Sequence, residues 1–167
     1  MDRETNEESG ANKTGLMGAA TKQKLIDACE AYVEKKLQTV QTAIDDLQAA
    51  LKLETKCSMG DKYETGRAML HLEFEKLAGQ HEEFQKLRKT LRMIPPGRKD
   101  VTAGFGSGVR TSMANYFIAI PAGEIIIEGE KFYSIGATAP ISKNITGRSA
   151  GDKIRFNDRE IEILEVF

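Results

Sequence analysis

The sequence predicts an α+β protein: an N-terminal antiparallel coiled-coil helical hairpin followed by a small, mostly antiparallel sheet domain. Two long stretches before residue 95 carry apolar residues at heptad-like spacing, which is typical of paired helices. After Pro95-Pro96-Gly97 the chain changes to short aromatic or β-branched runs separated by turn residues, which is typical of strands. A chain of 167 residues accommodates one ordinary domain or two small ones.

The first helix is predicted from about Lys22 to about Cys57. Residues 1–20 are polar with several small residues, so we expect a flexible arm there, and Thr21 is a suitable N-cap. Gly60 follows the helix in the position that glycine favours after a helix C-terminus. The apolar seam of this helix consists of Ile26, Cys29, Val33, Leu37, Val40, Ile44, Leu47 and Leu51.

The second helix repeats this spacing and ends before Pro95-Pro96. Two long helices joined by a short turn run antiparallel and bury each other's stripe, so we expect a hairpin over residues 21–94. His81 lies on the seam, and we interpret it as an interior or boundary histidine because no second metal-ligand residue is suitably spaced. The seam consists of Leu70, Phe74, Leu77, His81, Phe84, Leu87 and Leu91.

Residues 98–167 are predicted to form the second domain. It begins with a glycine-rich loop, and Pro140–Ile145 is expected to form a short helix that ends at Gly147. The pair Asn157-Asp158 is expected to turn a closing hairpin. The predicted strands are Tyr116–Ile120, Glu124–Ile127, Lys131–Ile135, Ile154–Phe156 and Ile161–Val166.

The sequence argues against an enzyme with its own active centre. It contains no phosphate-loop motif, no cysteine pair at metal-ligand spacing and no nucleophile beside a base. The spacing Gly104-x-Gly106-x-Gly108 precedes strands rather than a helix, which disfavours a dinucleotide site. No apolar run is long enough to span a membrane, and the N-terminus is polar and acidic. We therefore expect a cytoplasmic protein with two reduced, packing cysteines.

Basic residues are concentrated between Gln85 and Arg110, although the net charge of the chain is −1. This stretch contains seven basic residues and one acid, Asp100. One interpretation is a solvated helix face that runs into a linker. The other is a surface that faces RNA phosphates, formed by Lys86, Lys89 and Arg92.

The most informative segment is the expected turn between the helices, Gly60–Gly66, which we call the tip. Asp61 and Glu64 have the spacing of a capping box at the start of the second helix. Gly66 argues against a tip that serves stability alone, because glycine inside a helix lowers stability by about 1 kcal/mol relative to alanine. A carboxylate pair at the end of a helical hairpin is also suited to delivery into a cavity of another protein.

The tip resembles that of the Gre bacterial transcript-cleavage factors, whose pattern is Gly-Asp-x-x-Glu-Asn-Ala. Here the residues are Gly60-Asp61-Lys62-Tyr63-Glu64. The second half resembles the Ser-Pro-Leu, Leu-x-Gly-Lys and Gly-Asp-x-Val series and the last strand of the same family. The resemblance covers residues 22–167. The corresponding segments are Ala139-Pro140-Ile141, Ile145-Thr146-Gly147-Arg148, Gly151-Asp152-Lys153-Ile154 and Ile161–Val166.

The resemblance implies an FKBP-like second domain that docks at the rim of the secondary channel of RNA polymerase, with Pro140 and Ile141 in the contact. The hairpin would enter the channel, and Asp61 and Glu64 would help to hold a Mg²⁺ ion shared with the polymerase. The polymerase itself would then hydrolyse backtracked nascent RNA. No cofactor bound to the free protein, no membrane contact and a monomeric state are expected.

The tip departs from the family pattern, with Thr65 in place of Asn, Gly66 in place of Ala, and Arg67-Ala68 in place of a later acid and tyrosine. Thr138-Ala139 replaces the usual Asp-Ser before the proline. These departures keep open a second function: a factor that enters the same channel and inhibits or retunes the polymerase without stimulating cleavage. A prolyl isomerase and a coiled-coil adaptor are further alternatives, and the absence of tryptophan disfavours the isomerase.

Overall fold

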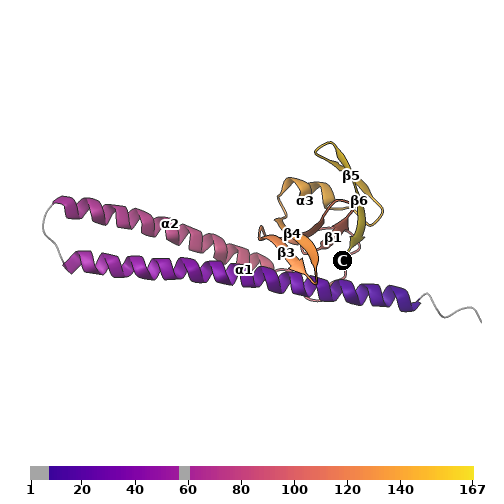
Figure 1. Cartoon of the computed structure of the whole chain (residues 1–167), viewed down its shortest axis with the longest axis horizontal. Helices are drawn as coiled ribbons and strands as arrows, with labels where there is room; N and C mark the ends of the chain where they lie inside the picture. The colour runs from indigo at the N-terminus through magenta and orange to yellow at the C-terminus, as the bar shows by residue number, and fades with distance from the viewer. Residues whose placement is uncertain (1–7, 57–60) are drawn as a thin grey trace, which may run out of the picture. The chain divides into compact units, whose positions relative to one another are not determined.

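The structure, a computed structural model, describes residues 8–56 and 61–167, with side chains from 17 to 54 and from 64 onward (Figure 1). The predicted turn residues Cys57 and Gly60 lie outside the described part. The chain forms two compact units. The sheet unit comprises Met1–Glu30 together with Thr90–Phe167, and the hairpin unit comprises Ala31–Lys89.

The hairpin unit consists of parts of two long helices, α1 (Glu8–Lys56) and α2 (Asp61–Arg92). Arg88 Nη1 lies 3.6 Å from Glu34 Oε2, and a Cβ atom placed on Gly66 would lie 3.6 Å from Glu54 Oε2. The first contact joins the middle of α1 to the end of α2, and the second joins the end of α1 to the start of α2. The helices therefore run antiparallel, as predicted.

The two apolar seams face each other across the hairpin unit. The register set by these contacts places Val40 level with His81 and Ile44 level with Leu77. Val33, Leu37, Val40 and Ile44 are buried, and their α2 counterparts are half-buried. The heptad prediction is confirmed for residues 31–54 and 64–89.

The beginning of α1 differs from the prediction. The helix starts at Glu8, so residues 8–20 are helical rather than a flexible arm, and Thr21 is not an N-cap. The Thr21 hydroxyl instead donates a hydrogen bond to the Met17 carbonyl within the helix. The prediction failed because Gly18 and its small neighbours suggest a flexible segment, whereas they allow the helix to approach the sheet closely.

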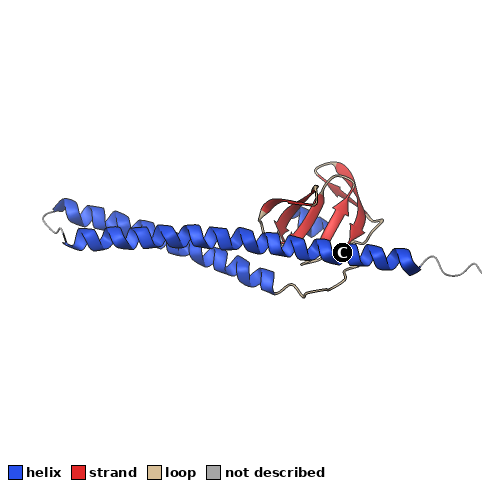
Figure 2. Ribbon diagram, turned by 60° about the horizontal axis from the view of Figure 1, so that its bottom comes forward, coloured by secondary structure: helices blue, strands red, loops and turns tan. Residues whose placement is uncertain are grey.

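The sheet unit contains a six-stranded sheet in the described part of the chain, with strand order β3-β4-β2-β1-β6-β5. Figure 2 draws the strands of this sheet in red. The pairing of β2 with β4 is parallel, and the other neighbouring pairs are antiparallel. A short helix, α3 (Pro140–Ile145), follows β4. The strands are β1 (Gly108–Thr111), β2 (Asn115–Ala119), β3 (Gly123–Ile127), β4 (Glu130–Gly136), β5 (Lys153–Phe156) and β6 (Arg159–Val166).

Both faces of the sheet are packed. On one face, α3 contributes Ile141 and Ile145 to a core with Tyr116, Ile118 and residues of β1, β5 and β6. On the other face lies the beginning of α1, where Cys29 Sγ is 3.3 Å from Ser134 Oγ. Successive side chains of β2 point to opposite faces of the sheet, and both faces are covered. Four of its five residues are therefore buried.

The five predicted strands and the short helix are confirmed to within two residues at each end. The hairpin turn at Asn157-Asp158 is also confirmed, since both residues have positive φ values of 49° and 61°. Strand β1 was missed. Its sequence, Gly-Val-Arg-Thr, follows a glycine-rich loop and is too short to show alternation.

Candidate functional site

The predicted tip acids lie at the beginning of α2. The helix starts at Asp61, and Glu64 follows one turn later with an exposed side chain. Residues three apart lie on the same side of a helix, so the backbone places both acids on one face of the first turn. The Asp61 side chain lies outside the described part, so the hydrogen bonds of a capping box remain a prediction.

Gly66 faces a carboxylate of the opposing helix. A Cβ atom placed on Gly66 would lie 3.6 and 3.7 Å from the two Glu54 carboxylate oxygens. Glu54 Oε2 is buried and accepts no hydrogen bond from the described residues. Sequence reasoning did not identify Glu54, because its position after Leu51 only continues the seam. Because Gly66 has no side chain, the Glu54 carboxylate can lie close to the α2 backbone.

Gly66→Ala is expected to stabilise the protein by up to about 1 kcal/mol. The distance from the new methyl group to Glu54 is that of ordinary van der Waals contact, and the φ angle of Gly66 is not positive. Urea unfolding checks the gain. Gly79→Ala on the same helix is the matched control, because nothing lies within 4 Å of its Cβ position. If Gly66→Ala destabilises the protein and Gly79→Ala does not, the Glu54 carboxylate requires the space that glycine leaves at position 66.

Most of the basic residues between Gln85 and Arg110 have acidic partners. Lys86 contacts Glu82 and Glu83, and Arg88 contacts Glu34. Arg98 and Arg110 are also engaged by carboxylates. Lys89 and Arg92 are exposed and form no ion pair with the described residues. The solvated-face interpretation therefore fits Lys86, whereas Lys89 and Arg92 keep both interpretations open.

The two predicted docking residues have different environments. Pro140 is exposed at the first turn of α3, whereas Ile141 is 9% exposed and belongs to the core beneath that helix. The Ile141 side chain is therefore not exposed, and the predicted contact of both residues with a partner stays a prediction. The two environments differ because a six-residue helix presents one face to the sheet, and adjacent residues point in different directions.

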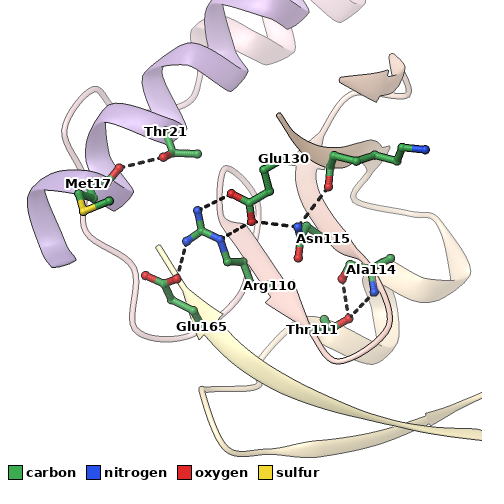
Figure 3. A network of polar contacts seen from close by, with 9 residues as sticks. Met17, Thr21, Arg110, Thr111, Ala114, Asn115, Glu130 and Glu165 are labelled. Atoms are coloured by element: carbon green, nitrogen blue, oxygen red, sulfur yellow. Dashed lines mark hydrogen bonds and ion pairs between the residues drawn. The ribbon is translucent and has the colours of Figure 1, made fainter. Parts of the chain in front are cut away.

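Sequence reasoning also missed a polar network on the α1 side of the sheet (Figure 3). Arg110 on β1 donates from Nε and Nη2 to the two Glu130 carboxylate oxygens, at 2.6 and 3.0 Å. It also donates to Glu165 on β6, while Asn115 donates to Glu130 at 3.0 Å. The guanidinium carbon lies 4.8 Å from the Phe167 ring centroid. One side chain thus links β1, β4 and β6, which only the sheet order brings together.

A hollow of about 330 Å³ lies beside this network. Arg110 is already engaged by two carboxylates, and Glu128 is paired with Lys24. The hollow therefore does not present a free guanidinium to a phosphate or carboxylate ligand. It is lined by Met17, Thr21, Arg110, Ile127, Glu128, Glu130 and Glu165.

The sheet unit is expected to lose stability in acid. Hydrogen bonds from Arg110 hold the pKa of Glu130 below its ordinary value. Burial alone would raise the pKa of Asp100, but hydrogen bonds from Arg98, Lys22 and Ser107 outweigh it and lower that pKa. Because folding lowers both pKa values, this stabilisation is present above the ordinary carboxyl pKa of about 4 and is lost as the pH falls through the lowered values.

Urea unfolding at pH 7, 5, 4 and 3 measures this dependence. Glu130→Gln should flatten part of the slope, whereas Glu160→Gln on an exposed strand end should not. Equal stability at pH 7 and pH 3 would contradict the assignment.

Comparison of the chain with protein-family models and with curated proteins finds no match. Among the residues whose side chains are described, no group of three or more His, Cys, Asp or Glu could hold a metal ion. None of the described helices combines the length and apolar character needed to cross a bilayer. The fold and the candidate site thus define the protein as an α+β protein with a helical hairpin unit and a six-stranded sheet unit, and with two acids in the first turn of α2.

Proposed function

We propose that this protein is a transcription elongation factor that binds RNA polymerase through the secondary channel and promotes cleavage of backtracked RNA. The sheet domain, proposed to be FKBP-like, docks at the channel rim. The hairpin enters the channel and carries Asp61 and Glu64 toward the polymerase active centre. The chain performs no hydrolysis itself, because the chemistry belongs to the polymerase.

The observation that carries this proposal is the position of the two acids. They occupy the first turn of α2, at the end of the hairpin remote from the contact of Glu34 with Arg88. Carboxylate oxygens are suitable ligands for Mg²⁺. The paired helices hold both acids at the end of the hairpin. Two carboxylates cannot complete six-coordination, so the remaining ligands would come from the polymerase and water. Glu64 is exposed, as this role requires.

One observation favours a second function, in which the protein occupies the channel and retunes the polymerase without stimulating cleavage. Arg67 is exposed and lies three residues after Glu64 on α2, hence on the same side of the helix. A cation there competes with a metal ion for the Glu64 carboxylate. The residues that replace the family's Asn and Ala, Thr65 and Gly66, belong to the same turn.

Two measurements test the proposal. The tagged chain should co-purify RNA polymerase, and the purified chain should shorten RNA in stalled, backtracked complexes in the presence of Mg²⁺. Binding without cleavage would favour the second function. Failure to bind polymerase in either the free or the stalled state would refute both functions.

Pro140→Asp is expected to weaken polymerase binding about tenfold or more, since a charge placed in the core of an interface is strongly disfavoured. The fold should be unaffected, because Pro140 is exposed and an acid suits the beginning of a helix. Affinity and thermal melting are measured together. Ala150→Asp, exposed elsewhere in the domain, is the control. Unchanged affinity would remove α3 from the docking surface.

A further inference from the structure

Lys22 interrupts the apolar stripe by which the beginning of α1 contacts the sheet. The stripe residues Gly18, Lys22, Leu25 and Cys29 are spaced by four, three and four, so they lie along one side of the helix. Leu25 and Cys29 are fully buried, and Lys22 is 3% exposed. A buried lysine is rare unless its ammonium group is paired.

The Lys22 ammonium group has specific partners in the segment after Pro96. Nζ lies 2.8 Å from Asp100 Oδ2 and donates to the Arg98 carbonyl at 3.0 Å. Asp100 also accepts hydrogen bonds from Arg98 and from Ser107, whose side chain is fully buried. These contacts hold Asp100 in one position and leave one place for the ammonium group.

Apolar packing alone would define the position of α1 along the sheet poorly. A shift of α1 by one turn brings Ile26, Cys29 and Val33 to the places of Lys22, Leu25 and Cys29, and all three are buried apolar residues. Lys22 can meet Asp100 only in the observed register. A buried ion pair contributes little net stability relative to apolar residues, but a single buried polar group can fix a helix register.

Gly18 restricts the same shift. A Cβ atom on Gly18 would lie 2.9 Å from the Phe167 Cβ, so a longer residue brought to this place by the shift would collide with Phe167. Gly18 thus adds a steric cost to this one shift, whereas Lys22 selects the observed register electrostatically.

We propose that the Lys22–Asp100 pair is a register lock that fixes the position of α1 on the sheet domain. A shift of one turn corresponds to about 5.4 Å along the helix axis, so the pair distinguishes registers of α1 that differ by this distance on the sheet.

A disulfide reporter tests the lock in the full-length chain. Ser134→Cys places a thiol beside Cys29, whose Sγ is 3.3 Å from the present hydroxyl oxygen, and Cys57→Ser removes the other native thiol. Each reporter protein is equilibrated in a glutathione redox buffer, and the effective concentration of the two thiols is measured. Lys22→Met with Asp100→Leu removes both charges and avoids an unpaired buried carboxylate. Lys24→Met, on the exposed side of α1, is the matched control.

The effective concentration should fall about tenfold or more in the Lys22→Met, Asp100→Leu reporter and stay unchanged in the Lys24→Met reporter. Urea unfolding must show that each reporter is folded, so that the fall measures position rather than stability. An unchanged effective concentration in the folded double variant would overturn the proposal.

Discussion

Asp61→Asn and Glu64→Gln are each expected to abolish stimulated cleavage of backtracked RNA while polymerase binding survives. A metal ligand at this position needs its negative charge, because a neutral amide neutralises no charge on Mg²⁺. The measurement is the rate of RNA shortening in stalled complexes at saturating factor, with affinity determined separately.

The same substitutions separate the metal role from a capping role. A cap needs only a hydrogen-bond acceptor, so Asp61→Asn should cost a few tenths to about 1 kcal/mol of stability. Glutamine also serves at the third position of a capping box, so Glu64→Gln should be mild. Glu73→Gln, an exposed acid farther along α2, is the matched control for loss of one charge. Full cleavage by both tip variants would assign Asp61 and Glu64 to the cap.

The wild-type chain can also decide against the metal role. If it binds polymerase and gives no cleavage at saturating Mg²⁺, the tip is a capped turn on a channel plug. Arg67→Ala then becomes informative, because Arg67 shares the exposed face of the first α2 turn with Glu64. Cleavage gained by Arg67→Ala would identify the cation as the feature that suppresses metal binding.

The hairpin was predictable from the sequence because its seam residues repeat with the period of the helix. Val33, Leu37, Val40 and Ile44 are buried as their spacing indicates. Spacing does not reveal the partner, however. Cys29 continues the same seam but meets Ser134 on β4, and Ile94, just after α2, lies beside Gly106. Residues 8–30 and 90–94 therefore belong to the sheet unit, which periodicity alone could not show.

The candidate site was only partly predictable for a related reason. Asp61 and Glu64 were found from local spacing, and both lie in the first turn of α2. The Arg110 network depends on strands far apart in the sequence, and Lys22 had no sequence signal beyond its place one turn after Gly18. Ile141 was assigned to a surface by motif position, whereas the direction of α3 decides that it is buried.

Gly108→Ala is expected to cost about 3 kcal/mol, at the upper end of the range for overpacking a core. A Cβ atom on Gly108 would lie 2.3 and 2.4 Å from Cε2 and Cζ of the Phe167 ring. The ring cannot easily move away, because Phe132 packs edge-on at 6.2 Å between centroids and the Arg110 guanidinium carbon lies 4.8 Å from the ring centroid. Urea unfolding of the full chain measures the loss.

Two further variants distinguish a steric cause from a general intolerance of β1. Gly104→Ala, in the preceding loop, has open space around its Cβ position and should be nearly neutral. Phe167→Leu removes the part of the ring that meets Gly108, so Gly108→Ala should cost much less in that background, with a coupling of about 1–3 kcal/mol. Equal costs in both backgrounds would place the conflict in the β1 backbone, which pairs with the Phe167 main chain through hydrogen bonds of 2.8 and 2.9 Å. A large coupling would instead establish that the Phe167 ring occupies the space beside Gly108 that the absence of a Cβ leaves open.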